Sequence, residues 1–182
     1  MSNTILKVNI PGLRNSNEEH WQTLFENEDP INFYRVQQHN WEQPDCETWI
    51  DEIELSLSKF DHSKLILIGH SIGCIAIIKW FEKYGHHIKG ALLAAPSDSE
   101  REGYPNYITG FTPIPTTLLP FPSVVVASNN DHVTLLERSE FFAQSWGSKM
   151  IILRDAGHIE PKSGFGYWQK GKDIIRELES IS

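Results

Sequence analysis

The chain has 182 residues, 40% of them hydrophobic, which suits one globular domain spanning residues 1–182 with a full hydrophobic core. The formal net charge is -8, and the 16 basic residues are scattered along the chain, so we expect no nucleic-acid partner. No stretch approaches the roughly 20 apolar residues that span a bilayer. Because the N-terminus also lacks a signal-peptide pattern, we expect a cytoplasmic protein with no membrane partner.

Segments typical of strands alternate along the chain with segments typical of helices, and neither repeats nor linkers interrupt them. In chain order we expect a strand at Ile5–Ile10, a helix opening at Ser16 with Glu19 in capping-box spacing, a strand at Ile31–Val36, a helix at Cys46–Leu57, a strand at Leu65–Ile68, a helix after Ser71, strands at Ala91–Ala95 and Val124–Ala127, a helix at Leu135–Trp146, a strand at Met150–Leu153 and a helix at Trp168–Leu178. This alternation predicts an α/β fold with a mostly parallel sheet of about six strands and helices on both faces.

The stretch GHSIG, which follows the strand Leu65–Ile68, points to a chemical role for Ser71. An apolar strand, a sharp turn and an apolar helix form the context that a G-x-S-x-G nucleophile elbow requires. A serine hydroxyl is a weak nucleophile at neutral pH, so it needs an imidazole as base and a carboxylate to orient that imidazole. Ser71 is therefore a candidate nucleophile.

Two other strand ends supply the missing groups. Asp131 lies in SNNDH after Val124–Ala127, and His158 lies in RDAGH after Met150–Leu153. Ligands of parallel sheets bind at the carboxyl ends of the strands, and the order Ser, Asp, His is that of α/β-hydrolases. Asp98 and Asp155 are alternatives for the acid, although either could simply stabilise a turn, and we favour Asp131.

The same chemistry needs donors for a negatively charged tetrahedral oxygen. The backbone N–H of Ile72, at the start of the helix after Ser71, is one expected donor. A backbone N–H near Leu13, in the loop after the first strand, is the second. This scheme uses no metal and no cofactor, and the spacing of the histidines does not resemble a zinc site.

The two cysteines and the other histidines are expected to be structural. Cys46 and Cys74 lack C-x-x-C spacing, so we expect both to be reduced and packed in the core. His70 occupies a variable position of the elbow, and His132 neighbours Asp131. Four histidines resemble ordinary surface residues: His39, His62, His86 and His87.

A long connection from residue 99 to residue 121 is rich in proline and aromatic residues and joins two strands whose ends face the expected site. Segments of this length are often functional. Four of its side chains are candidates for an apolar wall or partial lid around the substrate: Tyr104, Tyr107, Phe111 and Leu118. The alternative is that the connection only covers the edge of the sheet.

Several uncommon blocks of the sequence, taken together, resemble a known family. The blocks are PGLRNSNEEHW, GHSIGC, GALLAAPSD, LPFPSVVVASNNDH, WGSKMIIL and GHIEPKSGFGYW, which run from about residue 5 to about residue 170. They resemble the small serine hydrolases typified by retinoblastoma-binding protein 9 and bacterial YdeN. This resemblance implies a compact α/β-hydrolase fold without a large cap domain, and a triad of Ser71, Asp131 and His158.

Together these observations predict a serine hydrolase, most simply a carboxylesterase that acts on small or medium acyl esters through an acyl-enzyme intermediate. An acyltransferase or thioesterase would use the same residues. The family name also allows a protein partner, so a non-catalytic protein-interaction module on a hydrolase fold is the second hypothesis. The L-x-C-x-E pattern that would favour such binding is missing around both cysteines.

Overall fold

The protein is described by a computed structural model that covers residues 4–181. Its centre is a six-stranded sheet with the order β2-β1-β3-β4-β5-β6, in which every neighbouring pair is parallel. The strands are β1 (Leu6–Ile10), β2 (Phe33–Arg35), β3 (Leu65–His70), β4 (Gly90–Ala94), β5 (Ser123–Ser128) and β6 (Lys149–Leu153). This agrees with the predicted α/β sheet.

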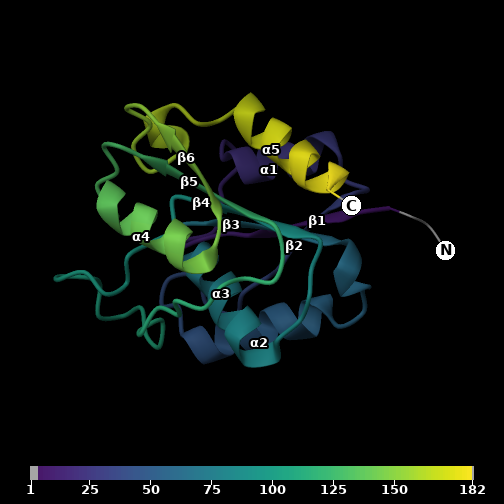
Figure 1. Ribbon diagram of the computed structural model, residues 1–182, viewed down its shortest axis with the longest axis horizontal. Coiled ribbons are helices and arrows are strands. Elements are labelled where there is room, and N and C mark those ends of the chain that lie inside the picture. Colours follow the sequence, from purple (N-terminus) through teal and green to yellow (C-terminus); the bar gives the residue numbers. More distant parts are fainter. Residues whose placement is uncertain (1–3, 182) are drawn as a thin grey trace.

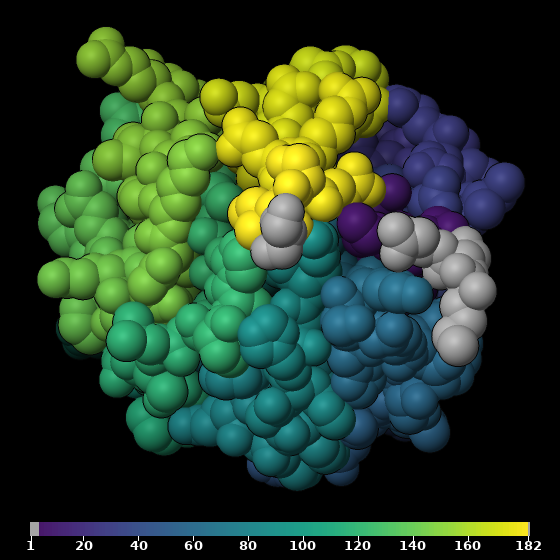
Figure 2. Space-filling model, turned by 45° about the vertical axis from the view of Figure 1, so that its right-hand side comes forward, coloured from purple at the N-terminus to yellow at the C-terminus, as the bar shows by residue number. Residues whose placement is uncertain are grey.

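Helices cover both faces of this sheet (Figure 1). They are α1 (Trp21–Glu28), α2 (Cys46–Leu57), α3 (Ile72–Tyr84), α4 (Leu136–Trp146) and α5 (Gln169–Ser180). Helices α1 and α5 pack on one face, and α2, α3 and α4 pack on the other. The space-filling view shows α5, in yellow, against the indigo segment that contains α1 (Figure 2), where Lys172 forms an ion pair with Glu28.

The core follows from the two-residue period of the strands. In β3, Leu65 and Leu67 point to the face with α2 and α3, whereas Ile66 and Ile68 point to the face with α1 and α5. All six residues of β3 are buried because helices cover both sides of it. The strand that precedes Ser71 is therefore held firmly in the middle of the sheet.

The largest difference from the predicted boundaries is at the first helix. The first helix begins at Trp21 instead of Ser16, and residues 11–20 form turns. Ser16 does not cap a helix, because its hydroxyl donates to Gln22 Oε1 at 2.6 Å. His20 is the N-cap, and its Nδ1 accepts a hydrogen bond from the Gln22 amide at 3.2 Å. The residues freed from the helix form a loop beside Ser71.

The connection between β4 and β5 contains no helix or strand, although it forms an isolated bridge between Thr109 and Asp45. It crosses the end of the sheet without building a cap domain, as the resemblance implied. Within residues 4–181 we find no helix that is both long enough and apolar enough to cross a membrane.

Candidate active site

Ser71 sits on a strained turn between β3 and α3. Its backbone angles are φ 55° and ψ -126°, a conformation that is costly for a residue with a side chain. The glycines on either side make this turn fit. A β-carbon on Gly69 would lie 2.9 Å from Cα of Cys74, and one on Gly73 would lie 2.2 Å from the carbonyl oxygen of Ile10. The G-x-S-x-G spacing is thus explained by close contact of α3 with β3 and β1.

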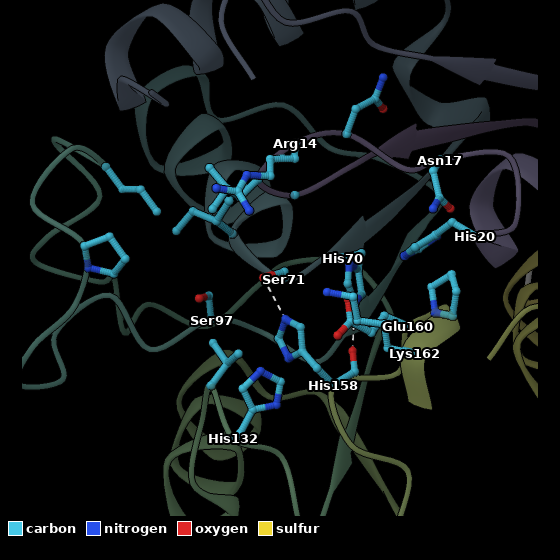
Figure 3. A pocket seen from close by; sticks show the side chains of 18 of the residues that line it. Arg14, Asn17, His20, His70, Ser71, Ser97, His132, His158, Glu160 and Lys162 are labelled. Atoms are coloured by element: carbon cyan, nitrogen blue, oxygen red, sulfur yellow. Dashed lines mark hydrogen bonds between the residues drawn. The ribbon is translucent and has the colours of Figure 1, made fainter. Parts of the chain in front are cut away.

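Three residues that are far apart in the sequence form one hydrogen-bonded chain. Ser71 Oγ donates to His158 Nε2 at 2.9 Å, as drawn in Figure 3, and His158 Nδ1 donates to the two oxygens of Asp131 at 3.0 and 2.8 Å. His158 and Asp131 are buried, and Asp131 also accepts from the Val133 amide at 2.8 Å. A hydroxyl held this way can lose its proton to the imidazole as it attacks a carbonyl carbon.

The loops after β5 and β6 hold Asp131 and His158 at the right separation. Asn130 Oδ1 accepts from the Gly157 amide at 2.7 Å, and Asn129 Oδ1 accepts from the Asp155 amide at 2.7 Å. The two strands are neighbours, so these short side chains bridge directly between their ends. The two asparagines of the SNNDH block therefore bind the loop that carries His158.

The alternative carboxylates have other partners. Asp98 receives two hydrogen bonds from Arg138, at 3.0 and 3.1 Å, and is buried. Asp155 is exposed and lies in a left-handed turn at φ 52°. His158 is therefore hydrogen-bonded to Asp131, and not to Asp98 or Asp155.

Two histidines that sequence reasoning left aside, His70 and His20, line the site. Nε2 of His70 donates to the backbone carbonyl of His158 at 2.9 Å (Figure 3). The rings of His20 and His70 meet edge to face at 4.7 Å between centroids. Burial lowers the pKa of His20 to about 3, with further contributions from the Arg35 charge and from His158, and burial also lowers the pKa of His70 well below its usual value. Both rings therefore stay neutral beside His158.

Trp21 fixes the residue after His158. Its indole N–H donates to the carbonyl oxygen of Ile159 at 2.9 Å, and its ring packs against Trp168 at 4.9 Å between centroids. In the sequence, His70 belongs to the block GHSIG and Trp21 to the block PGLRNSNEEHW. Neither block indicates which residues these two side chains contact.

The loop after β1 reaches Ser71, the candidate nucleophile. A β-carbon on Gly12 would lie 2.9 Å from Cβ of Ser71 and 3.6 Å from the amide nitrogen of Ile72. Leu13 and Ile72, the two expected oxyanion donors, both line the pocket that contains Ser71. The next two residues, Arg14 and Asn15, have φ values of 66° and 63°, a pair of left-handed residues without glycine.

Arg35, at the end of β2, holds this unusual loop. Its guanidinium donates to Asn15 Oδ1 at 3.0 Å and to the carbonyl oxygen of Ser16 at 2.9 Å. It also donates to Thr23 Oγ1 at 2.5 Å and pairs with Glu26 at 2.8 Å. The hydrogen bonds to Arg35 offset the backbone strain at Arg14 and Asn15.

A pocket of about 440 Å³ opens above Ser71. Its wall combines apolar side chains with polar and charged ones (Figure 3), and its lining residues are Gly12, Leu13, Arg14, Asn15, Asn17, His20, His70, Ser71, Ile72, Ser97, Arg101, Tyr104, Pro105, Ile108, His132, Val133, His158, Glu160, Pro161 and Lys162. Ser71 is thus accessible to a small ligand.

The predicted substrate wall is corrected by this lining. Of its four residues only Tyr104 contacts the pocket, where its hydroxyl bonds with Ser97 Oγ at 2.9 Å. Phe111 is buried against Trp49 in the core, at 5.9 Å between ring centroids. Tyr107 and Leu118 are 42% and 67% exposed and lie outside the lining. The connection alternates between core anchors and solvent-facing residues, so its apolar side chains do not form one wall.

The cysteines have no place in this chemistry. Cys74 is buried one turn into α3, where its thiol donates to the Ala94 carbonyl at 3.3 Å, and burial raises its pKa well above the usual value. Burial also raises the pKa of the Cys46 thiol to about 12. In the described part of the chain, no group of three or more His, Cys, Asp or Glu side chains is arranged to hold a metal ion.

The parallel sheet, the strained serine at the end of β3 and the helices on both faces define an α/β-hydrolase fold. The family model described as serine hydrolase matches residues 7–177, and the chain belongs to this family of small α/β-hydrolases. The resemblance predicted from the sequence blocks is therefore confirmed. No curated protein shows a significant match.

Solved structures agree with this assignment. A YdeN-like hydrolase from Pectobacterium atrosepticum is 32% identical, with a TM-score of 0.84 over 96% of this chain and 90% of that one. The ydeN gene product of B. subtilis is 21% identical, with a TM-score of 0.77 over 98% and 100% of the two chains. The esterase RhEst1 from a Rhodococcus species shares the fold at 11% identity, with a TM-score of 0.68 over 98% and 92%.

Proposed function

We propose that this serine hydrolase is a carboxylesterase for small or medium acyl esters, with Ser71, His158 and Asp131 as its catalytic triad. The observation that carries the proposal is the hydrogen-bonded chain from Ser71 Oγ through both ring nitrogens of His158 to the Asp131 carboxylate, at 2.9, 3.0 and 2.8 Å. A pocket of about 440 Å³ limits the substrate to a small molecule.

In the first half of the reaction, Ser71 Oγ attacks the ester carbonyl while His158 Nε2 takes its proton. Asp131 keeps the other ring proton on Nδ1 and stabilises the imidazolium that forms. His158 then gives the Nε2 proton to the leaving alkoxide, and an acyl group remains on Ser71. In the second half, a water molecule loses a proton to His158 as it attacks the acyl carbon. The bond from that carbon to Ser71 Oγ then breaks, His158 returns the proton to Ser71 Oγ, and the carboxylic acid is released.

The tetrahedral oxygen needs two donors at the mouth of the elbow. The Ile72 amide starts α3, so its N–H is free of the helix ladder and carries the positive end of the helix dipole. The Leu13 amide is the proposed second donor, because the adjacent Gly12 lies against Ser71. One such donor contributes about 10²- to 10³-fold to kcat.

His70 and His20 favour this mechanism because both remain neutral while His158 cycles. A cationic neighbour would oppose formation of the imidazolium. The hydrogen bond from His70 to the His158 carbonyl also fixes the backbone of the catalytic base.

The experiment is covalent labelling with a fluorophosphonate probe, read by intact mass, on the wild type and the variants Ser71→Ala, His158→Ala and Asp98→Asn. We expect one adduct on the wild type and on Asp98→Asn, and none on the other two within the same time. Hydrolysis of 4-nitrophenyl butyrate should follow the same order, with a loss of at least about 10³-fold for Ser71→Ala. A folded wild type that takes no label would contradict the esterase and favour the interaction-module hypothesis.

A further inference from the structure

Charged side chains from three separate loops meet around the pocket. Arg14 follows β1, Arg101 follows β4 and Lys162 follows β6, and all three line the cavity above Ser71. Among the described lining residues Glu160 is the only carboxylate, so the wall carries a net positive charge although the whole chain carries -8. In Figure 3 Arg14 and Lys162 stand on different sides of Ser71.

These cations are available to a ligand. Within residues 4–181, neither Arg101 nor Lys162 has a carboxylate in ion-pair range, and the Arg101 guanidinium lies 5.7 Å from the Tyr104 ring. Arg14 pairs with Glu42 at 3.1 Å, but both side chains are more than two thirds exposed, so water competes with this pair.

Arg138, in the same region, is a contrasting case because carboxylates bind its guanidinium. It lies close to the loop after β4, yet its guanidinium is held by the carboxylates of Asp98 and Glu100 at 2.7 to 3.1 Å. Carboxylates thus neutralise Arg138, which is outside the pocket lining, whereas Arg101 and Lys162 face the pocket without a carboxylate partner among the described residues. Guanidinium and ammonium groups bind carboxylates by charge-assisted hydrogen bonds.

We propose that the substrate of this site is an ester that carries a carboxylate of its own, bound by Arg101 and Lys162 with help from Arg14. This inference rests on the esterase function proposed above and adds the charge class of the substrate. The apolar side chains of Ile108 and Val133 in the same lining leave room for a short hydrocarbon spacer between the ester and the carboxylate.

The test compares esters matched in size, by acid release in a pH-stat at pH 7.5. Monomethyl glutarate against methyl pentanoate places the carboxylate on the acyl side, and butanoyl glycolate against ethyl butanoate places it on the alcohol side. We expect kcat/KM to be about tenfold higher for the acidic member of at least one pair, mainly through KM, and the preference to shrink in 0.5 M NaCl because salt screens partly exposed charges.

The variants Arg101→Gln and Lys162→Gln should lower the acidic-to-neutral ratio, and the double variant should remove most of it. Lys170→Gln, an exposed lysine of α5 outside the lining, is the matched control and should leave the ratio unchanged. Circular dichroism checks that each variant is folded.

The outcome separates two failures. If no ester is hydrolysed and the fluorophosphonate does not react, the esterase function itself is wrong. If neutral esters turn over at least as fast as both acidic partners, or if the double variant lowers both members of a pair equally, the carboxylate inference is overturned while the esterase stands.

Discussion

Two segments at the same edge of the sheet border the pocket, and they are held in different ways. The loop at 11–20, after β1, is fixed by polar contacts, chiefly those of Arg35 with Asn15 and Ser16. The segment at 95–122, after β4, is fixed mainly by apolar anchors such as Phe111 and Ile114, which are buried in the core. Hydrogen bonds with fixed directions thus orient the shorter loop beside Ser71, whereas buried apolar side chains anchor the longer segment, which reaches the pocket through residues such as Ser97 and Arg101.

This contrast explains why the length and composition of the longer segment do not predict which residues line the pocket. The longer segment contains the aromatic residues, but Phe111 is buried in the core and Tyr107 faces solvent. The shorter loop has few apolar residues and yet supplies a large part of the lining. Four predictions test the difference, from the largest expected effect to the smallest.

The first prediction concerns the contact between the short loop and Ser71, the proposed nucleophile. The Gly12→Ala variant places a β-carbon 2.9 Å from Cβ of Ser71 and 3.0 Å from the His70 carbonyl, so the loop must move away. We expect kcat/KM for 4-nitrophenyl butyrate to fall by about 10³-fold, as for loss of an oxyanion donor. Gly85→Ala, where a β-carbon meets nothing within 4 Å, is the control. It should lose some stability because its φ is 68°, but little activity, and equal activity losses would contradict the idea.

The second prediction concerns the pH dependence of stability. The pKa of His20 is lowered to about 3 in the folded state. Between this value and pH 6.5, the His20 ring therefore binds a proton in the unfolded chain but not in the folded one. Stability from His20 is therefore present above pH 6.5 and is lost as the pH falls, by about 3 kcal/mol at pH 4. The buried His70 acts in the same direction.

Urea unfolding at pH 7 and pH 4 measures this loss. The His20→Asn variant keeps an N-cap acceptor for α1 but removes the titrating ring, so its stability should depend less on pH. The exposed His39 provides the control variant His39→Asn, which should behave like the wild type. An unchanged pH slope in His20→Asn would refute the assignment.

The third prediction concerns the hydrogen bonds by which Arg35 holds the short loop. In Arg35→Gln the hydrogen bonds to Asn15 and Ser16 are weakened, and we expect kcat to fall by about 10- to 100-fold with little change in KM, because the loop amides lose their alignment. Arg138→Gln removes the guanidinium of α4 that binds Asp98 in the long segment, and it should change kcat by less than about threefold. Steady-state kinetics on one ester measures kcat and KM of both variants. A larger loss of kcat in Arg138→Gln than in Arg35→Gln would contradict the distinction between the two segments.

The smallest effect is expected at the exposed side chains of the long segment. Tyr107→Ser and Leu118→Ser should change kcat/KM by less than about twofold, because neither side chain lines the pocket. Tyr104→Phe removes the hydroxyl that bonds with Ser97 at the pocket wall, so it should have the largest effect on kcat/KM of the three variants. A strong loss in Leu118→Ser would restore the lid hypothesis.

The sheet and the positions of Ser71, Asp131 and His158 were predictable because local patterns determine them. A buried strand is an apolar run, and in a parallel sheet every such run ends at the same edge, so polar residues after three runs must lie near one another. The favoured residues Ser71, His158 and Asp131 are hydrogen-bonded in this order, and the structure adds the partners that set Asp98 and Asp155 apart from Asp131.

The tertiary structure alone decided which other residues join them. His20 and His70 meet across 50 positions of sequence, and Arg35 reaches back to a loop that the capping-box pattern had assigned to a helix. The cations Arg14, Arg101 and Lys162 look scattered in the sequence and face one cavity in the fold. The sequence by itself determined the strand ends, because burial of a strand is a local property. Contacts between loops depend on how separate segments pack, so they became visible only once the sheet had brought those loops together.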